Sequence, residues 1–156
     1  MTVYYLDSSA WVKRYCQEPG SAWVAKLFAQ TPNLACSTLG VIEVTAALSR
    51  KAKAGELDAV AFEARLELAD RDWAGFMALE LTAELLDRAR QAARDRALRA
   101  ADAIHLAAAL VLRRDFAEPG DRVVLVTSDE ELESAAVAEG IPVVDPVDAD
   151  RADAAL

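Results

Sequence analysis

The chain has 156 residues, of which 54% are hydrophobic and 28% are charged, a composition typical of one globular domain that builds its core without disulfides. Its apolar stretches are shorter than the roughly 20 residues needed to cross a bilayer, and its first residues, MTVYYLDSSA, carry no visible export signal, so we expect a soluble, cytoplasmic protein. The formal net charge of −9 argues against broad, nonspecific binding to nucleic acid, because phosphates are repelled by the mean field.

Short runs rich in β-branched and aromatic residues alternate along the chain with stretches of helical periodicity. The short runs predict strands at residues 3–6, 34–37, 76–81, 123–127 and 142–144. The periodic stretches predict helices over residues 8–16, 21–29, 39–54, 58–72, 82–97, 100–114 and 129–139. Strands separated by helices indicate an α/β fold with a mostly parallel sheet of about five strands.

No linker or repeat divides the chain, so we expect a single domain over residues 1–145 and an acidic C-terminal tail over residues 146–156. From residue 145 onward, four aspartates face one arginine, Arg151. Such a charge run is typical of a solvated chain end.

Four carboxylates, spread across the chain, lie in apolar stretches where an unpaired charge is costly. Asp7 follows VYYL, Glu43 lies within LGVIEVTAAL, Asp102 lies within LRAADAIHLAAAL, and Asp129 ends VVLVTSD. A buried, ionised carboxylate needs a cation or hydrogen-bond donors. Since ligands of α/β sheets collect beyond the carboxyl ends of the strands, we expect these four acids to form one site.

Structural explanations remain open for each acid. Asp7 and Asp129 have the positions of helix N-caps, although Ser128 competes with Asp129 because Ser128 and Glu131 have the spacing of a capping box. Asp102 shares a helical face with Leu98, Leu106 and Ala109, and Glu43 shares one with Leu39, Ala46 and Ala47, so both faces point toward the core or a crevice. Buried salt bridges to Arg50, Arg96 or Arg99 are the alternative to a metal.

The ligand types favour Mg²⁺ or Mn²⁺ as the cation, because hard divalent ions prefer carboxylate oxygens. Zinc is disfavoured, since the only histidine, His105, is expected to be a packed or hydrogen-bonded residue rather than a ligand. Cys16 and Cys36 match no zinc or redox spacing and are expected to be buried, small hydrophobic residues.

Four blocks of the sequence, in order, resemble a known family. They are YYLDSSAWVKRY, VIEVTAALSR, LRAADAIHLAAAL and VTSDEELESAAVAEGI. Together they resemble the PIN-domain ribonucleases, and within them the VapC-type toxins of bacterial toxin-antitoxin pairs. The resemblance implies a three-layer α/β/α fold, an acidic catalytic and metal-binding site of Asp7, Glu43, Asp102 and Asp129, and Thr127 or Ser128 as a polar helper at the substrate. It also implies metal-dependent hydrolysis of RNA, a VapB-type antitoxin as partner, and homodimerisation.

An acidic protein that binds RNA needs a local basic patch. The segment from Asp87 to Arg99 holds five arginines against two aspartates and directly precedes the helix of Asp102. Arg96 and Arg99 are therefore the candidate contacts to substrate phosphate, although a solvated helix face with ion pairs would show the same pattern.

Two other functions are alternatives to the nuclease. Another Mg²⁺-binding α/β domain that handles phosphoryl groups, such as a haloacid-dehalogenase-type phosphatase or a receiver, would carry a second acid near Asp7, but Ser8 and Ser9 stand there. A glycine-rich nucleotide loop is also missing after the first predicted strand. A catalytically silent binding module with the same fold is the nonenzymatic alternative, which the presence of all four acids disfavours.

Overall fold

The structure, a computed structural model, describes residues 1–30, 33–116 and 120–155 of the chain. Five parallel strands form one sheet in the order β3-β2-β1-β4-β5. The strands are β1 (Thr2–Leu6), β2 (Leu34–Ser37), β3 (Met77–Leu79), β4 (Arg122–Val126) and β5 (Val143–Val144). The helices are α1 (Ser8–Trp11), the 3₁₀ helix η1 (Val12–Arg14), α2 (Ser21–Gln30), α3 (Thr38–Lys53), α4 (Ala59–Trp73), α5 (Ala83–Arg96), α6 (Ala100–Asp115), α7 (Glu130–Ala138) and α8 (Pro146–Ala154).

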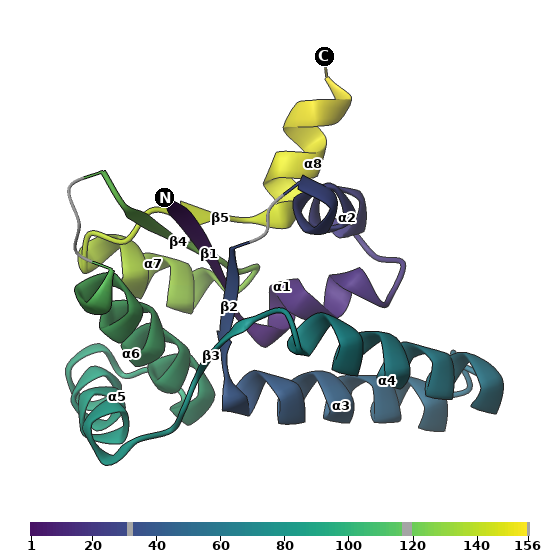
Figure 1. Cartoon of the computed structure of the whole chain (residues 1–156), viewed down its shortest axis with the longest axis horizontal. Coiled ribbons are helices and arrows are strands. Elements are labelled where there is room, and N and C mark those ends of the chain that lie inside the picture. Colours follow the sequence, from purple (N-terminus) through teal and green to yellow (C-terminus); the bar gives the residue numbers. More distant parts are fainter. Residues whose placement is uncertain (31–32, 117–119, 156) are drawn as a thin grey trace.

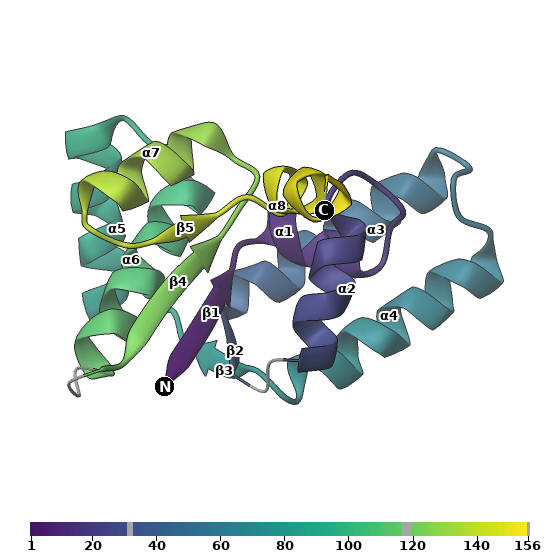
Figure 2. The same cartoon turned by 90° about the horizontal axis from the view of Figure 1, so that it is seen from above.

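Helices cover both faces of the sheet, as the three-layer prediction requires (Figures 1 and 2). Helices α5, α6 and α7 lie on one face and share a core with Tyr5 and Leu125, whereas α1, α3 and α4 lie on the other and share a core with Leu6 and Val126. Neighbouring residues of one strand thus face opposite cores. Burial on both faces explains why β1 and β4 read as continuous apolar runs.

The predicted elements are confirmed, with differences at their ends. The helix expected over residues 8–16 divides into α1 and η1, and the strand expected over 76–81 is limited to Met77–Leu79. Within the described ranges, no helix has both the length and the apolar character to span a membrane.

The acidic tail forms a helix, α8, in which Pro146 is buried and the last turn is largely exposed. Asp145 is the N-cap of α8, because its side chain accepts a hydrogen bond from the backbone N–H of Val147. Pro146 occupies the first helical turn. An aspartate N-cap followed by proline is typical of the start of a helix. Pro146 is buried beside Gly20, and Asp153 pairs with Lys26 of α2. The helix packs against α2 and crosses it (Figures 1 and 2). Leu156, the last tail residue, lies outside the described residues.

Candidate functional site

The carboxyl ends of β1 and β4 flank the point where the winding of the sheet changes direction. From β1 the chain passes to β2 and β3 on one side, and it later returns to β4 and β5 on the other. Ligands of open α/β sheets bind at such a point. A pocket of about 220 Å³ opens there, which we call the acid pocket, and it is lined by Asp7, Ser8, Ser9, Glu43, Arg99, Ala101, Asp102 and Asp129. All four predicted carboxylates therefore line one pocket.

Asp7 is held at the floor of the acid pocket by three donors. The backbone N–H of Ala10 donates to Oδ1 at 2.9 Å, the Ser9 hydroxyl donates to both carboxylate oxygens, and Thr127 Oγ1 donates to Oδ2 at 2.8 Å. The side chain is almost completely buried, and this burial raises the pKa of Asp7, while nearby His105 and the three donors act in the opposite direction. The helix-cap explanation is thus correct for Asp7, and it holds together with the pocket position.

Glu43 is oriented by a buried chain of hydrogen bonds. His105 Nε2 lies 2.7 Å from Glu43 Oε2, and His105 Nδ1 lies 2.9 Å from the hydroxyl of Tyr5. That hydroxyl also accepts the backbone N–H of Ser37, and burial raises the pKa of Tyr5 well above its usual value, so Tyr5 keeps its proton. The Tyr5 O–H can thus donate to Nδ1 of His105, and in that arrangement Nε2 is the ring nitrogen that donates to Glu43. His105 is therefore a hydrogen-bonded core residue, as predicted.

Asp102 and Asp129 share one arginine. Arg99 donates from Nε to Asp102 Oδ2 at 2.9 Å and from Nη2 to Asp129 Oδ2 at 2.7 Å. Burial raises the pKa of Asp102, Arg99 lowers it, and the charge of Asp129 adds to the increase. Asp129 also caps α7, since its Oδ1 accepts the N–H of Leu132. The salt-bridge alternative is therefore present in the structure for these two acids.

Ser128 does not cap α7, contrary to the capping-box prediction. Its hydroxyl donates instead to Asp145 at 2.8 Å, which connects the loop after β4 to the start of α8. Thr127 is fully buried, and its hydroxyl donates to Asp7. Neither hydroxyl is presented to the acid pocket as a free substrate contact, so both act as positioning groups here.

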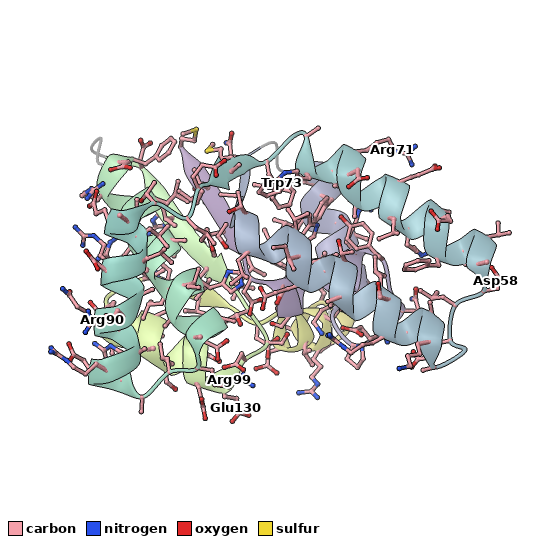
Figure 3. The ribbon with its side chains drawn as sticks, turned by 90° about the horizontal axis from the view of Figure 1, so that it is seen from below. Asp58, Arg71, Trp73, Arg90, Arg99 and Glu130 are labelled. Atoms are coloured by element: carbon pink, nitrogen blue, oxygen red, sulfur yellow. The ribbon has the colours of Figure 1, made fainter. Side chains whose placement is uncertain are left out.

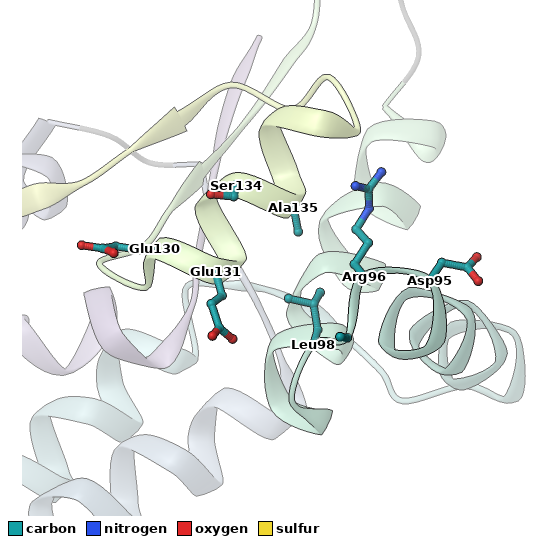
Figure 4. Close-up of a pocket in the computed structure, with 8 residues that line it drawn as sticks. Asp95, Arg96, Leu98, Glu130, Glu131, Ser134 and Ala135 are labelled. Atoms are coloured by element: carbon teal, nitrogen blue, oxygen red, sulfur yellow. The ribbon is translucent and has the colours of Figure 1, made fainter.

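The predicted basic patch consists largely of ion pairs. Arg96 pairs with Glu139, Arg94 with Asp95, and Arg88 with Glu84. Figure 4 shows Arg96 and Glu130 at opposite ends of a separate, larger pocket of about 570 Å³, formed by the end of α5, the turn into α6, and α7. Arg96 does not line the acid pocket, whereas Arg99 does. Of the two predicted phosphate contacts, the structure thus places only Arg99 at the acids.

Sequence reasoning missed two residues that build the acid pocket. Ser9 lines it and donates to Asp7, and its position two residues after Asp7 was the available signal, because such short spacings allow local side-chain hydrogen bonds. The other residue is Tyr5, which belongs to the first predicted strand. Its contact with His105 joins residues 100 positions apart, and no local pattern contains that information.

The acid pocket has the ligand chemistry of a site for a hard divalent cation. Four carboxylates line it, and no histidine or cysteine does, which fits Mg²⁺ or Mn²⁺. Within residues 1–30, 33–116 and 120–155, however, no three acidic, histidine or cysteine side chains converge closely enough to hold one ion. Two of the four acids, Asp102 and Asp129, each accept a hydrogen bond from Arg99 at Oδ2.

Similarity to known proteins agrees with this fold. The PIN domain family model matches residues 4–138. Ribonuclease VapC45 of Mycobacterium tuberculosis is 38% identical over 144 residues, which cover 90% of this chain and 93% of that protein. The crystal structure of PAE2754 from Pyrobaculum aerophilum has a TM-score of 0.65 at 26% identity over 92% of each chain.

A toxin-antitoxin complex from Klebsiella pneumoniae has a TM-score of 0.62 at 19% identity, over 92% of this chain and 97% of that chain, which shows a shared fold. The family match includes all four acids and strands β2, β3 and β4, and the sequence identity extends over most of the chain. On these grounds the protein belongs to the PIN domain family, as a VapC-type member.

Proposed function

We propose that the protein is a Mg²⁺- or Mn²⁺-dependent endoribonuclease that hydrolyses RNA phosphodiester bonds at the acid pocket. The observation that carries this proposal is the convergence of four carboxylates, from four separate segments, on one pocket at the switch point of the sheet. The similarity to a protein named as a ribonuclease supports RNA as the substrate, and that substrate suits a cytoplasmic location.

Asp7, Glu43, Asp102 and Asp129 would hold the metal, which when bound supplies an activated water and neutralises charge on the attacked phosphate. The remaining residues of the site keep these acids in position. Ser9 and Thr127 restrain Asp7, and His105, backed by Tyr5, restrains Glu43. Such restraints support catalysis because a rigid site needs no reorganisation during the reaction.

A groove of about 360 Å³ continues from the acid pocket between α1, η1 and α3, and it shares Ser8, Ser9 and Glu43 with that pocket. Arg50 lines this groove and, within the described residues, pairs with no carboxylate. An unpaired arginine beside a nuclease site suits a backbone phosphate of the substrate. We therefore assign the groove to the RNA strand that leads away from the scissile bond.

The test compares two aspartates that both cap helices. Asp7 caps α1 inside the acid pocket, whereas Asp58 caps α4 at its outer end, far from Arg99 (Figure 3). Partner-free wild-type protein, Asp7→Asn and Asp58→Asn are incubated with a mixed RNA pool, with Mg²⁺ or with EDTA. We expect cleavage by the wild type and Asp58→Asn in Mg²⁺ only, and cleavage at least about 100-fold slower by Asp7→Asn, the size of loss typical of a group that stabilises the transition state directly.

Undiminished cleavage by Asp7→Asn would refute the assignment of the site. Wild-type protein that binds Mn²⁺ and RNA without cutting would favour the silent binding module. Phosphatase activity on small phosphomonoesters without RNA cleavage would favour the other Mg²⁺-binding domain.

The VapC relationship also leads us to assign this chain the role of the toxin in a toxin-antitoxin pair, with a VapB-type antitoxin as its partner. Ile42 is 67% exposed beside Glu43 and lines the groove with Val12, Ala46 and Ala47, an apolar track of the kind that a partner segment covers. A basic side chain of that partner would be attracted by the acid pocket. Homodimerisation stays a prediction, which light scattering on the partner-free protein would check.

A further inference from the structure

The cation closest to the acids is already part of the chain. Arg99 precedes the first turn of α6 and joins Asp102 on that helix to Asp129 at the start of α7. The two carboxylates are largely buried, but the arginine side chain is 71% exposed. Most of the Arg99 side chain is thus in solvent, where it can rotate away from the acids without disturbing the core.

Arg99 uses the oxygen that a metal would need at Asp129. Asp129 Oδ1 accepts the N–H of Leu132, so Oδ2 is the oxygen available to a further cation, and Arg99 Nη2 donates to it at 2.7 Å. The same guanidinium donates to Oδ2 of Asp102. A guanidinium leaves a second lone pair open on each of these oxygens, but two cations held at the same oxygen repel each other, so Arg99 and a divalent ion compete.

The arrangement of the acids is consistent with that competition. Among the residues that the structure describes, no group of three acidic or histidine ligands is set up for one ion, although four acids line the pocket. Arg99 offsets one of the two negative charges that Asp102 and Asp129 carry together when both are ionised. Without a cation, like charges this close repel each other and resist ionisation.

We propose that Arg99 is an internal counter-cation that occupies the acid pocket in the metal-free protein, and that a divalent ion must displace it in order to bind. This inference rests on the proposed metal-dependent function, and it adds a residue that sets how tightly the metal is held. Arg99 thereby keeps the metal-free pocket stable and lowers the apparent affinity for the metal.

The competing explanation is a purely structural tie between α6 and α7. A structural tie predicts that loss of Arg99 lowers stability and leaves metal affinity unchanged or weaker, because the ligands become less ordered. Competition predicts that loss of Arg99 makes metal binding tighter. The two explanations are therefore separated by measuring metal affinity rather than activity.

The experiment measures Mn²⁺ binding to partner-free protein, by electron paramagnetic resonance of free Mn²⁺ at fixed ionic strength. The variants are Arg99→Gln, Arg99→Lys and the matched control Arg96→Gln, which removes one arginine of the same segment that pairs with Glu139 outside the acid pocket. Circular dichroism confirms that each variant is folded.

We expect Arg99→Gln to bind Mn²⁺ about two- to tenfold more tightly than the wild type, the range that matches loss of an exposed ion pair together with its charge. Arg99→Lys should lie between the two, because a lysine keeps the charge but lacks the guanidinium fork. Arg96→Gln should stay within about twofold of the wild type, since its charge is distant and screened.

Equal or weaker binding by Arg99→Gln would overturn the inference, as would an equal gain in Arg96→Gln, which would show a general effect of net charge. If the wild type binds no Mn²⁺ and its RNA cleavage is indifferent to EDTA, the proposed function itself fails. If the wild type binds Mn²⁺ and Arg99→Gln binds it no better, only the role of Arg99 fails.

Discussion

Single aspartates in this protein carry out two tasks with two oxygens. Asp129 caps α7 through Oδ1 and pairs with Arg99 through Oδ2, and Asp7 caps α1 while its carboxylate lines the pocket. From the sequence, a helix N-cap and a ligand in the acidic site are alternative roles for such an aspartate. A carboxylate has about four lone-pair positions, however, and can fill both roles at once. An aspartate at a strand-to-helix junction is therefore compatible with a functional role even when its capping bond is evident.

The pKa of Asp7 leads to a prediction about stability and pH. Burial raises this pKa in the folded state, and no lysine or arginine pairs with Asp7 in the part of the chain that the structure describes. An acid whose folded pKa is raised stabilises the fold most when it is protonated in both states, and that contribution is lost as pH rises from its unfolded pKa of about 3.9 through its folded pKa.

We therefore expect Asp7→Asn to become more stable relative to the wild type as pH increases from about 4 to about 8. Urea unfolding in EDTA, across this range, gives the difference in the free energy of unfolding between the two proteins. Asp58→Asn serves as the control, since Asp58 caps α4 in an exposed position. A difference between Asp7→Asn and the wild type that is constant across the range would contradict the raised pKa.

At the scale of elements, the approach of α3 to β2 depends on one glycine. Gly40 lies in the first turn of α3, and a Cβ atom there would overlap the sulfur of Cys36 and touch the ring of Trp11. This close approach packs the first turn of α3 against Cys36 of β2, and Glu43 follows in the next turn of the helix. A helix of 16 residues thus takes its position from a residue without a side chain.

Gly40→Ala should lower the free energy of unfolding by about 1–3 kcal/mol, the usual cost of overfilling a packed site. Gly75→Ala is the matched control, because a Cβ there makes only an ordinary contact. Both are measured by urea unfolding. Adding Cys36→Ala to Gly40→Ala should recover part of the loss, since the overlapping sulfur is removed; equal stability of the two single variants would contradict this explanation.

At the scale of the whole molecule, the sheet separates two apolar cores, and α8 lies on the side of α2. Its buried contact is Pro146 against Gly20, and its ion pair is Lys26 with Asp153. Gly20 has a φ of 93° and no room for a Cβ beside Pro146. The close contact between α8 and the start of α2 therefore depends on glycine at this position. The acidic C-terminal residues therefore contribute to the fold despite their charge.

Removing residues 146–156 should leave a folded protein that is about 1–3 kcal/mol less stable, because one buried side chain and part of the α2 surface become exposed. Thermal and urea unfolding measure the loss. The control is Arg151→Ala, whose exposed partner Asp148 is on the same helix, and which should change stability by less than about 0.5 kcal/mol. If the truncated chain has wild-type stability, α8 is the solvated tail that its composition suggested.

Much of the fold and the choice of the four acids was predictable from the sequence. The spacing of apolar residues separates strands from helices, because each element buries a particular face. Parallel strands end at the same edge of the sheet, so acids that follow them are brought together. Asp102 was recognisable because its helical face is otherwise apolar. These are local properties, and the sequence alone determined them.

Only the tertiary structure decided which groups meet these acids. Glu43 and His105 are 62 positions apart, Arg99 and Asp129 are 30 apart, and Asp7 and Thr127 are 120 apart. Arg96 and Arg99 looked equivalent along the chain, yet one pairs with Glu139 and the other enters the acid pocket. Such contacts depend on how separate elements pack against each other, and no local pattern records that packing.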